Sequence, residues 1–187
     1  MKKVFPFTQV LEDDIVRLRL IRDSDTVELS KIAFEPSIWT FFTVDISNEL
    51  SLRNWIQSAI YDHMHKQRVP FAIELKESGQ VVGSTSFGNI SDRDRRLEIG
   101  WTWLGKDFQR TGINRRVKKL LLKYAFEVMK MERVEFKTDT LNVQSKNALY
   151  GIGAKEEGTL RSHTLMPDKR RRDTVYFSIL NNEWGEQ

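Results

Sequence analysis

The sequence contains no cysteine among its 187 residues. A disulfide framework, a cysteine nucleophile and a cysteine-ligated metal site are therefore excluded, and a reducing, cytoplasmic location is the simplest expectation. No stretch approaches the roughly 20 apolar residues of a membrane-spanning helix, and the start, MKKVFPFTQVLEDD, has no apolar run long enough for a signal peptide. The sequence also shows no metal-ligand spacing, so no metal ion is expected.

The excess of positive charge is small, with a net charge of +4 and a pI of about 9.3. This balance is compatible with an anionic ligand but is too weak by itself to argue for a nucleic acid. The basic segment DKRRRD (168–173) fits a solvated hairpin loop better than a nucleic-acid or ribosome contact. The length and a hydrophobic content of 40% fit a single globular domain over residues 1–187.

The apolar periodicity changes along the chain in a way that predicts an α+β (loosely α/β) fold. The expected order is strand, two helices, a three-stranded meander, helix, strand, helix, strand. The expected strands are 15–22, 69–76, 81–88, 97–104, 133–141 and 172–180, and the expected helices are 23–34, 47–67, 113–130 and 142–153. The unit over 97–141 predicts a right-handed crossover between two parallel strands. The other strands are expected to be antiparallel, which gives a mixed, mostly antiparallel sheet flanked by helices.

A glycine precedes a basic helix in the stretch DFQRTGINRRVKKLLLKYAF, residues 107–126. The first N–H groups of a helix have no partner inside it, and the helix dipole adds partial positive charge there. Because glycine lets the backbone approach a ligand closely, Gly112 with nearby Arg110, Arg115 and Arg116 predicts an anion site. The alternative is a glycine turn before a solvated, basic helix face. The pattern GxxxxGK[ST] is absent, which argues against a nucleoside triphosphatase.

The order of several short motifs resembles the GCN5-related N-acetyltransferase (GNAT) superfamily over about residues 12–184. Gln109-x-x-Gly112 follows a strand with EIGW and precedes a helix, a strand and NVQS. The stretches IGWTWL, GINRRVKKLLLKYAFE, VEFKTDTLNVQS, GAKEEGTLR and RDTVYFSIL are similar to the branch of ribosomal-protein N-terminal (alanine or serine) acetyltransferases. In the superfamily, Q/R-x-x-G-x-G/A binds the pyrophosphate of acetyl-coenzyme A. The last motif position, usually small, is Asn114 here, which could alter the phosphate contacts.

The resemblance implies a set of residues that bind acetyl-CoA as co-substrate. The pyrophosphate would be held by N–H groups of Gln109, Arg110, Thr111, Gly112, Ile113 and Asn114, with further phosphate contacts from Arg110 and Arg115. The pantetheine arm would lie along the strand that contains Ile99, Gly100 and Trp101, in the manner of an added strand. Asn142 would bind pantetheine, cap the following helix, or do both.

The resemblance also implies direct transfer of acetyl to an amine, and it suggests which residues take part. Glu98 is the candidate general base, and its alternative is a solvent-facing strand glutamate. An N–H near Gly100 or Trp101 would hold the thioester carbonyl oxygen. Ser145 is the preferred hydrogen-bond donor to the leaving sulfur. Tyr150 is the reserve donor, unless it is only a packed helix aromatic.

Two further residues are candidate acceptor contacts, namely Trp39 in the segment 39–44 and His163. The expected function is an acetyl-CoA-dependent N-acetyltransferase that acts on the α-amine of a protein or peptide N-terminus. The alternatives are a transferase for small amines and a catalytically silent acyl-CoA-binding regulatory module. Membrane and nucleic-acid partners are not expected, and a homodimer is an expectation from the resemblance alone.

Overall fold

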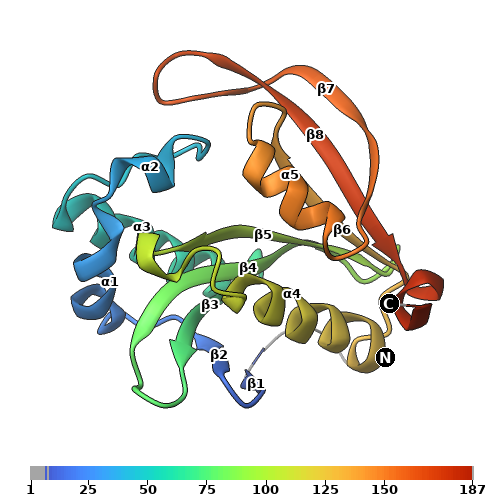
Figure 1. Cartoon of the computed structure of the whole chain (residues 1–187), viewed down its shortest axis with the longest axis horizontal. Coiled ribbons are helices and arrows are strands. Elements are labelled where there is room, and N and C mark those ends of the chain that lie inside the picture. The colour runs from blue at the N-terminus through green and yellow to red at the C-terminus, as the bar shows by residue number, and fades with distance from the viewer. Residues whose placement is uncertain (1–6, 8, 187) are drawn as a thin grey trace.

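An eight-stranded sheet forms the centre of the computed structural model, which describes Phe7 and residues 9–186 (Figure 1). Its strand order is β1-β2-β3-β4-β5-β6-β8-β7. The strands are β1 Leu11–Glu12, β2 Val16–Leu20, β3 Arg68–Leu75, β4 Val81–Ser91, β5 Arg96–Leu104, β6 Arg133–Asp139, β7 Lys155–Leu165 and β8 Arg171–Leu180. The α-helices are α1 Asp25–Ala33, α2 Pro36–Trp39, α3 Glu49–Met64, α4 Ile113–Lys123 and α5 Val143–Tyr150. A π-helical turn, Tyr124–Val128, continues α4.

The mixed sheet confirms the predicted fold class. Strands β5 and β6 pair in parallel, and all other neighbouring strands pair antiparallel. The predicted order was incomplete, because it lacked β1, α2 and β7. The omission of β7 has a clear physical reason: ten of its eleven residues are exposed, so the strand has no apolar alternation to reveal it.

Two hydrophobic clusters cover the two faces of the sheet. Along β3, Phe71 and Ile73 belong to the larger cluster, which includes the buried apolar residues of α4. Ala72, between them, belongs to the second cluster under α1, α2 and α3. This alternation is the two-residue period of a strand that is covered on both sides. Each large apolar side chain buried this way stabilises the fold by roughly 1.5–3 kcal/mol.

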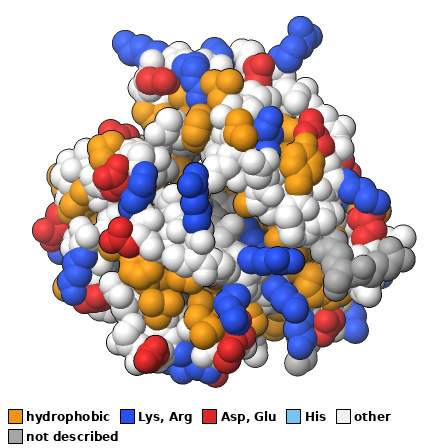
Figure 2. Space-filling view, in the orientation of Figure 1, with side chains coloured by type: hydrophobic (Ala, Val, Ile, Leu, Met, Phe, Trp, Pro, Cys, Tyr) orange, Lys and Arg blue, Asp and Glu red, His pale blue; other side chains and the backbone are white. Residues whose placement is uncertain are grey.

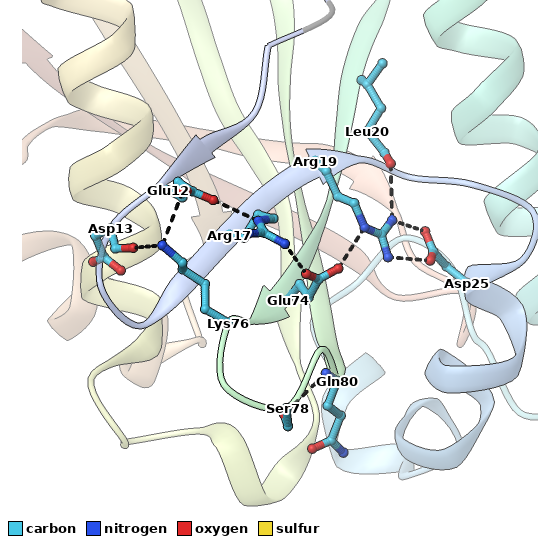
Figure 3. Close-up of polar contacts among 10 residues, drawn as sticks. All are labelled: Glu12, Asp13, Arg17, Arg19, Leu20, Asp25, Glu74, Lys76, Ser78 and Gln80. Atoms are coloured by element: carbon cyan, nitrogen blue, oxygen red, sulfur yellow. Dashed lines mark hydrogen bonds and ion pairs between the residues drawn. The ribbon is translucent and has the colours of Figure 1, made fainter.

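A network of charged side chains joins β2, β3 and the start of α1 (Figure 3). Arg19 donates to both carboxylate oxygens of Asp25, at 2.8 and 2.9 Å, and its Nε donates to Glu74 at 2.9 Å. Arg17 reaches the other oxygen of Glu74 at 3.1 Å. The hydrogen bond with Asp25 raises the pKa of Arg19 above its usual range, although burial opposes the charged form. The network fixes where α1 begins, and therefore also where α2 and the segment 40–43 lie.

Candidate functional site

A cavity of about 1040 Å³ lies where strands β5 and β6 separate. In the described chain, their parallel pairing covers only Arg96–Glu98 against Arg133–Glu135. Beyond Glu98, β5 continues to Leu104 with one backbone edge turned toward the cavity instead of toward β6. The rest of the wall comes from the start of α4, from α5, from the segment 37–43 and from parts of β4, β6, β7 and β8. Figure 2 shows Lys and Arg side chains around a hollow in the middle of one face of the molecule.

The N-terminal end of α4 forms one end of the cavity. Gly112 is the N-cap residue with φ of 89°, a left-handed conformation that favours glycine. No side chain caps this end, and the first turn of α4 contains no acidic residue. Arg110 and Arg115 line the cavity here, whereas Arg116 is turned toward Asp13 and Asp14. Open N–H groups, the helix dipole and two arginines together suit an anion such as a pyrophosphate.

The neighbouring residues of this turn divide into cavity-lining and supporting positions. Gln109 and Asn114 line the cavity, and Asn114 Oδ1 is buried there without a hydrogen-bond partner among the described residues. Ile113 is buried in the larger core, and the Thr111 hydroxyl donates to Phe108 O at 2.7 Å. The Thr111 hydroxyl therefore stabilises the turn and the Ile113 side chain packs in the core, and neither residue is among those that line the cavity.

Glu98 lies at the point where the two strands part, and its side chain is buried. The residue is 6% exposed, so the reading as a solvent-facing strand glutamate is wrong. Its Oε2 accepts hydrogen bonds from Asn89 Nδ2 at 2.5 Å and from Lys137 Nζ at 2.7 Å. Its Oε1 lies against Gly100, where an added Cβ would come within 2.9 Å of that oxygen. A glycine at position 100 is thus required for the observed placement of the carboxylate.

Lys137 forms the ion pair that holds Glu98. Burial by itself lowers the pKa of Lys137, but its hydrogen bond and ion pair with Glu98 and the negative charge of Glu135 raise that pKa by more. The lysine therefore stays protonated, and its Nζ also lies 5.1 Å from the centre of the Tyr176 ring. Sequence reasoning missed Lys137, although its alternation with the buried Val134, Phe136 and Thr138 along β6 places it on the face of Glu98.

Lys118 on α4 is a second buried lysine at the cavity that sequence reasoning missed. It is 6% exposed, and its Nζ donates to Thr102 Oγ1 at 2.7 Å. Burial lowers the pKa of Lys118 to about 7, although the negative charge of Glu98 acts in the opposite direction. Its spacing from the buried Leu121 and Leu122, three and four residues on, places it on the apolar face of the helix. This spacing alone would have predicted from the sequence that Lys118 faces the core.

Helix α5 places Ser145 in the cavity wall and turns Tyr150 elsewhere. Asn142 is the N-cap, and its Oδ1 accepts from the backbone N–H of Ser145 at 2.9 Å; both residues line the cavity. Tyr150 is half exposed, donates to Glu156 at 2.5 Å and packs edge-on against Phe177. These contacts match the reading of Tyr150 as a packed helix aromatic.

The two candidate acceptor contacts have different surroundings. Trp39 is 4% exposed, donates from Nε1 to Ala33 O at 2.6 Å and packs against Trp103 in the second core. Its neighbours Phe41, Phe42 and Thr43 line the cavity instead. Ile99, Gly100 and Trp101 of β5 and His163 of β7 also line the cavity, and His163 Nδ1 lies 3.1 Å from Thr174 Oγ1.

The described residues offer neither a metal site nor a membrane-spanning helix. Among them, no group of three or more His, Cys, Asp or Glu side chains could hold a metal ion. None of the helices in that part of the chain is long and apolar enough to cross a membrane.

The chain is similar to known acetyltransferases over most of its length. The model of the family described as "Acetyltransferase (GNAT) domain" matches residues 16–155. A protein of Bacillus subtilis (strain 168) named "Putative ribosomal N-acetyltransferase YdaF" is 29% identical over 179 residues, covering 92% of this chain and 95% of that protein. Two solved structures each have a TM-score of 0.88. One, described as a "putative acetyltransferase" from T. thermophilus, is 32% identical and covers 97% of this chain and 94% of its own. The other, a GCN5-related N-acetyltransferase from Brucella melitensis, is 25% identical, with coverages of 96% and 82%.

Proposed function

This chain belongs to the acetyltransferase (GNAT) family, and we propose that it transfers the acetyl group of acetyl-CoA directly to the α-amine of a protein or peptide N-terminus. The observation that carries this proposal is the buried Glu98–Lys137 pair at the point where β5 and β6 separate, in the same cavity as the open end of α4. The name of the Bacillus subtilis relative, a ribosomal N-acetyltransferase, supports a protein acceptor. The proposed setting is the cytoplasm, and a homodimer is proposed on family grounds alone.

The cavity suits acetyl-CoA at the end formed by α4. The uncapped N–H groups after Gly112, with Arg110 and Arg115, would hold the pyrophosphate. The free edge of β5 at Ile99 and beyond would pair with the amide groups of pantetheine, as an added strand does. Asn114 presents a buried acceptor that has no partner among the described residues, which suits a donor group of the ligand rather than a phosphate. Acetyl-CoA supplies the activated acyl group, and the residues of this chain bind and orient it.

Glu98 is the proposed base that takes the proton from the acceptor amine, directly or through one water. Its contacts with Asn89 and Lys137 both go to Oε2, so Oε1 beside Gly100 is the oxygen proposed to accept the proton. Lys137 keeps the carboxylate in place during the reaction. A positioned base of this kind contributes typically about 10²–10⁴-fold to a rate. Ser145, which lines the same cavity from α5, is proposed to donate to the leaving sulfur.

The basicity of the acceptor favours an α-amine over a lysine side chain. In an unstructured peptide the pKa is about 7.7–8.0 for an α-amine and about 10.4 for a lysine side chain. At about 1.36 kcal/mol per pKa unit, neutralising the lysine at pH 7 costs roughly 3.5 kcal/mol more. A site with a single carboxylate base is therefore better matched to the α-amine.

The test is acetyl-CoA consumption by the purified protein, with release of the free thiol as the readout. The acceptors are peptides with free Ser, Ala or Met N-termini, the same peptides with blocked N-termini, and small amines that include polyamines. Turnover that requires a free N-terminus is the expected result. Turnover with small amines alone would replace the proposed acceptor class, and failure to bind acetyl-CoA would refute the assignment of the α4 end.

One substitution separates an enzyme from a silent acyl-CoA-binding module. Glu98→Gln should lower kcat by about 10²–10⁴-fold while acetyl-CoA affinity, measured by calorimetry, stays unchanged. Glu77→Gln, on the exposed turn between β3 and β4, is the matched control and should have wild-type kcat. A silent module would bind acetyl-CoA equally well in all three proteins and show no turnover in any.

A further inference from the structure

The acceptor side of the cavity is the sheet face that carries Glu98. In the antiparallel pairing of β6 with β8, Lys137 lies opposite Tyr176, and Asp139 lies opposite Thr174. Arg172, two residues before Thr174, continues the same face of β8 beyond the end of β6. The buried apolar side chains of α4 pack on the other face. Arg172 thus lies on the opposite face of the sheet from the α4 core contacts, although it lines the same cavity as the start of α4.

Arg172 lines the cavity with a guanidinium group that the protein leaves incompletely paired. Its Nε is buried and has no hydrogen-bond partner among the described residues. Burial lowers the pKa of Arg172, yet an arginine remains protonated at any physiological pH. A buried cationic N–H without an acceptor is costly, because such a group loses water and gains nothing in return. The Nε of Arg172 is therefore a donor in the cavity wall that no described protein group engages.

The carboxylates near Arg172 are already bound to other cations. Asp139 and Glu98 both act on the pKa of Arg172 through their charge. Asp139 Oδ2, however, accepts from Arg170 Nη2 at 2.6 Å, and Glu98 Oε2 accepts from Lys137 Nζ at 2.7 Å. Each of these acids thus has a closer cationic partner, and the positive charge of Arg172 remains available to a ligand.

We propose that Arg172 binds a carboxylate of the acceptor, so that the amine acetylated by this protein carries a carboxylate near its amino group. The planar guanidinium fork matches a carboxylate in shape and charge. His163 and Thr174, which line the same part of the cavity, form the neighbouring polar wall. A polyamine acceptor would instead place positive charge next to Arg172, which disfavours it. This inference rests on the proposed acetyltransferase function and narrows its acceptor.

Two sources of such a carboxylate are distinguishable, namely an acidic side chain close to a peptide N-terminus and the α-carboxylate of a free amino acid. The test therefore measures kcat/KM for two matched acceptor pairs with acetyl-CoA in excess. The first pair is Ser-Asp and Ser-Asn peptides with amidated C-termini, and the second is serine and serinamide. A preference in the first pair assigns the carboxylate to a side chain, and a preference in the second assigns it to the α-carboxylate.

The expected result is a preference of about 10- to 100-fold for the acidic member of one pair, the range for a hydrogen bond to a charged group. Arg172→Met should abolish this preference, because it should lower kcat/KM for the acidic member about 10- to 100-fold more than for the neutral member. Arg172→Lys, which keeps the charge but not the fork, should retain part of the preference and guards against a folding defect in the Met variant. Arg161→Met changes an exposed arginine on the same hairpin and should behave as wild type.

Three results would overturn the inference. Equal kcat/KM within both pairs in the wild-type protein is one, and an equal loss for acidic and neutral acceptors in Arg172→Met is another, because a purely structural arginine would act on both. In either case acetylation continues and the proposed function stands. Absence of acetylation for every free amine would overturn the proposed function together with the inference.

Discussion

Replacing Lys118 by methionine should stabilise the protein, and the gain should depend on pH. In the folded state, burial lowers the pKa of Lys118 from 10.5 to about 7. A shift of this size costs about 5 kcal/mol at about 1.36 kcal/mol per pKa unit, because the unfolded chain binds the proton more tightly. Methionine has a similar length and no charge, so it avoids this cost. It also loses the hydrogen bond to Thr102, worth about 1 kcal/mol.

The sign of the pH dependence follows from the direction of the shift. Between pH 7 and 10.5 the unfolded chain keeps the proton on this lysine while the folded protein has released it, so the stability of the wild-type protein rises with pH across this window. Below pH 7 both states are protonated and the full penalty applies. The Met variant should thus exceed the wild type by about 4 kcal/mol at pH 6, and the difference should vanish near pH 10.

The assay is urea denaturation at pH 6, 7.5, 9 and 10, followed by tryptophan fluorescence. Thermal unfolding at pH 6 gives a second measurement of the same gain. At about 2–4 °C per kcal/mol for a domain of this size, the Met variant should melt roughly 8–16 °C above the wild type. Lys119→Met, the adjacent and exposed position on α4, is the control and should show no pH-dependent difference. A Lys118→Met protein that is less stable than wild type at pH 6, or whose difference does not change with pH, would refute the reasoning.

Two further predictions concern the reacting groups. Gly100→Ala places a Cβ 2.9 Å from Glu98 Oε1 and should displace the carboxylate, so that kcat falls by about 10-fold or more while the protein remains folded by circular dichroism. An unchanged kcat would show that the placement of Oε1 has no role in the reaction. Ser145→Ala should lower kcat, whereas Tyr150→Phe should leave kcat unchanged and remove only the exposed hydrogen bond to Glu156. The opposite ranking of these two kcat values would reassign the donor to Tyr150.

The secondary structure could be predicted wherever one face of an element is buried. Helix α3 is an example, because Leu52, Ile56 and Ala59 repeat at helical spacing and all three are buried. Strand β7 gave no such signal, because it lies at the edge of the sheet with nearly all of its side chains in solvent. Strand β7 is held in the sheet by its backbone pairing with β8, and the side chains of β7 itself do not reveal this pairing.

The sequence could suggest Glu98 but could not establish its burial. On β5 the flanking Leu97 and Ile99 are buried in the larger core, which places Glu98 on the opposite face, where a strand side chain is often solvated. What covers it is Asn89 from β4 and Lys137 from β6. These contacts depend on strand registers separated by many residues, and local spacing does not specify them.

The proposed acetyl-CoA end of the cavity can be predicted from the sequence more completely than the proposed acceptor end. The proposed acetyl-CoA end is built from consecutive residues, 109–115, so its turn, its helix start and its arginines are visible together in the sequence. The proposed acceptor end is assembled from β4, β5, β6, β7 and β8, and which of its charged side chains can bind a ligand is known only once each ion pair is known.

Arg172 shows this most clearly, because it lies in the basic run DKRRRD, where sequence alone indicates a solvated loop. The pairing of Arg170 with Asp139 and of Lys137 with Glu98 leaves Arg172 as the cation that we propose to bind the acceptor. If Arg172 binds the acceptor as proposed, acceptor specificity depends on the register between β6 and β8. Substitutions in β6 or β8 that change this register should then alter acceptor preference without affecting acetyl-CoA binding.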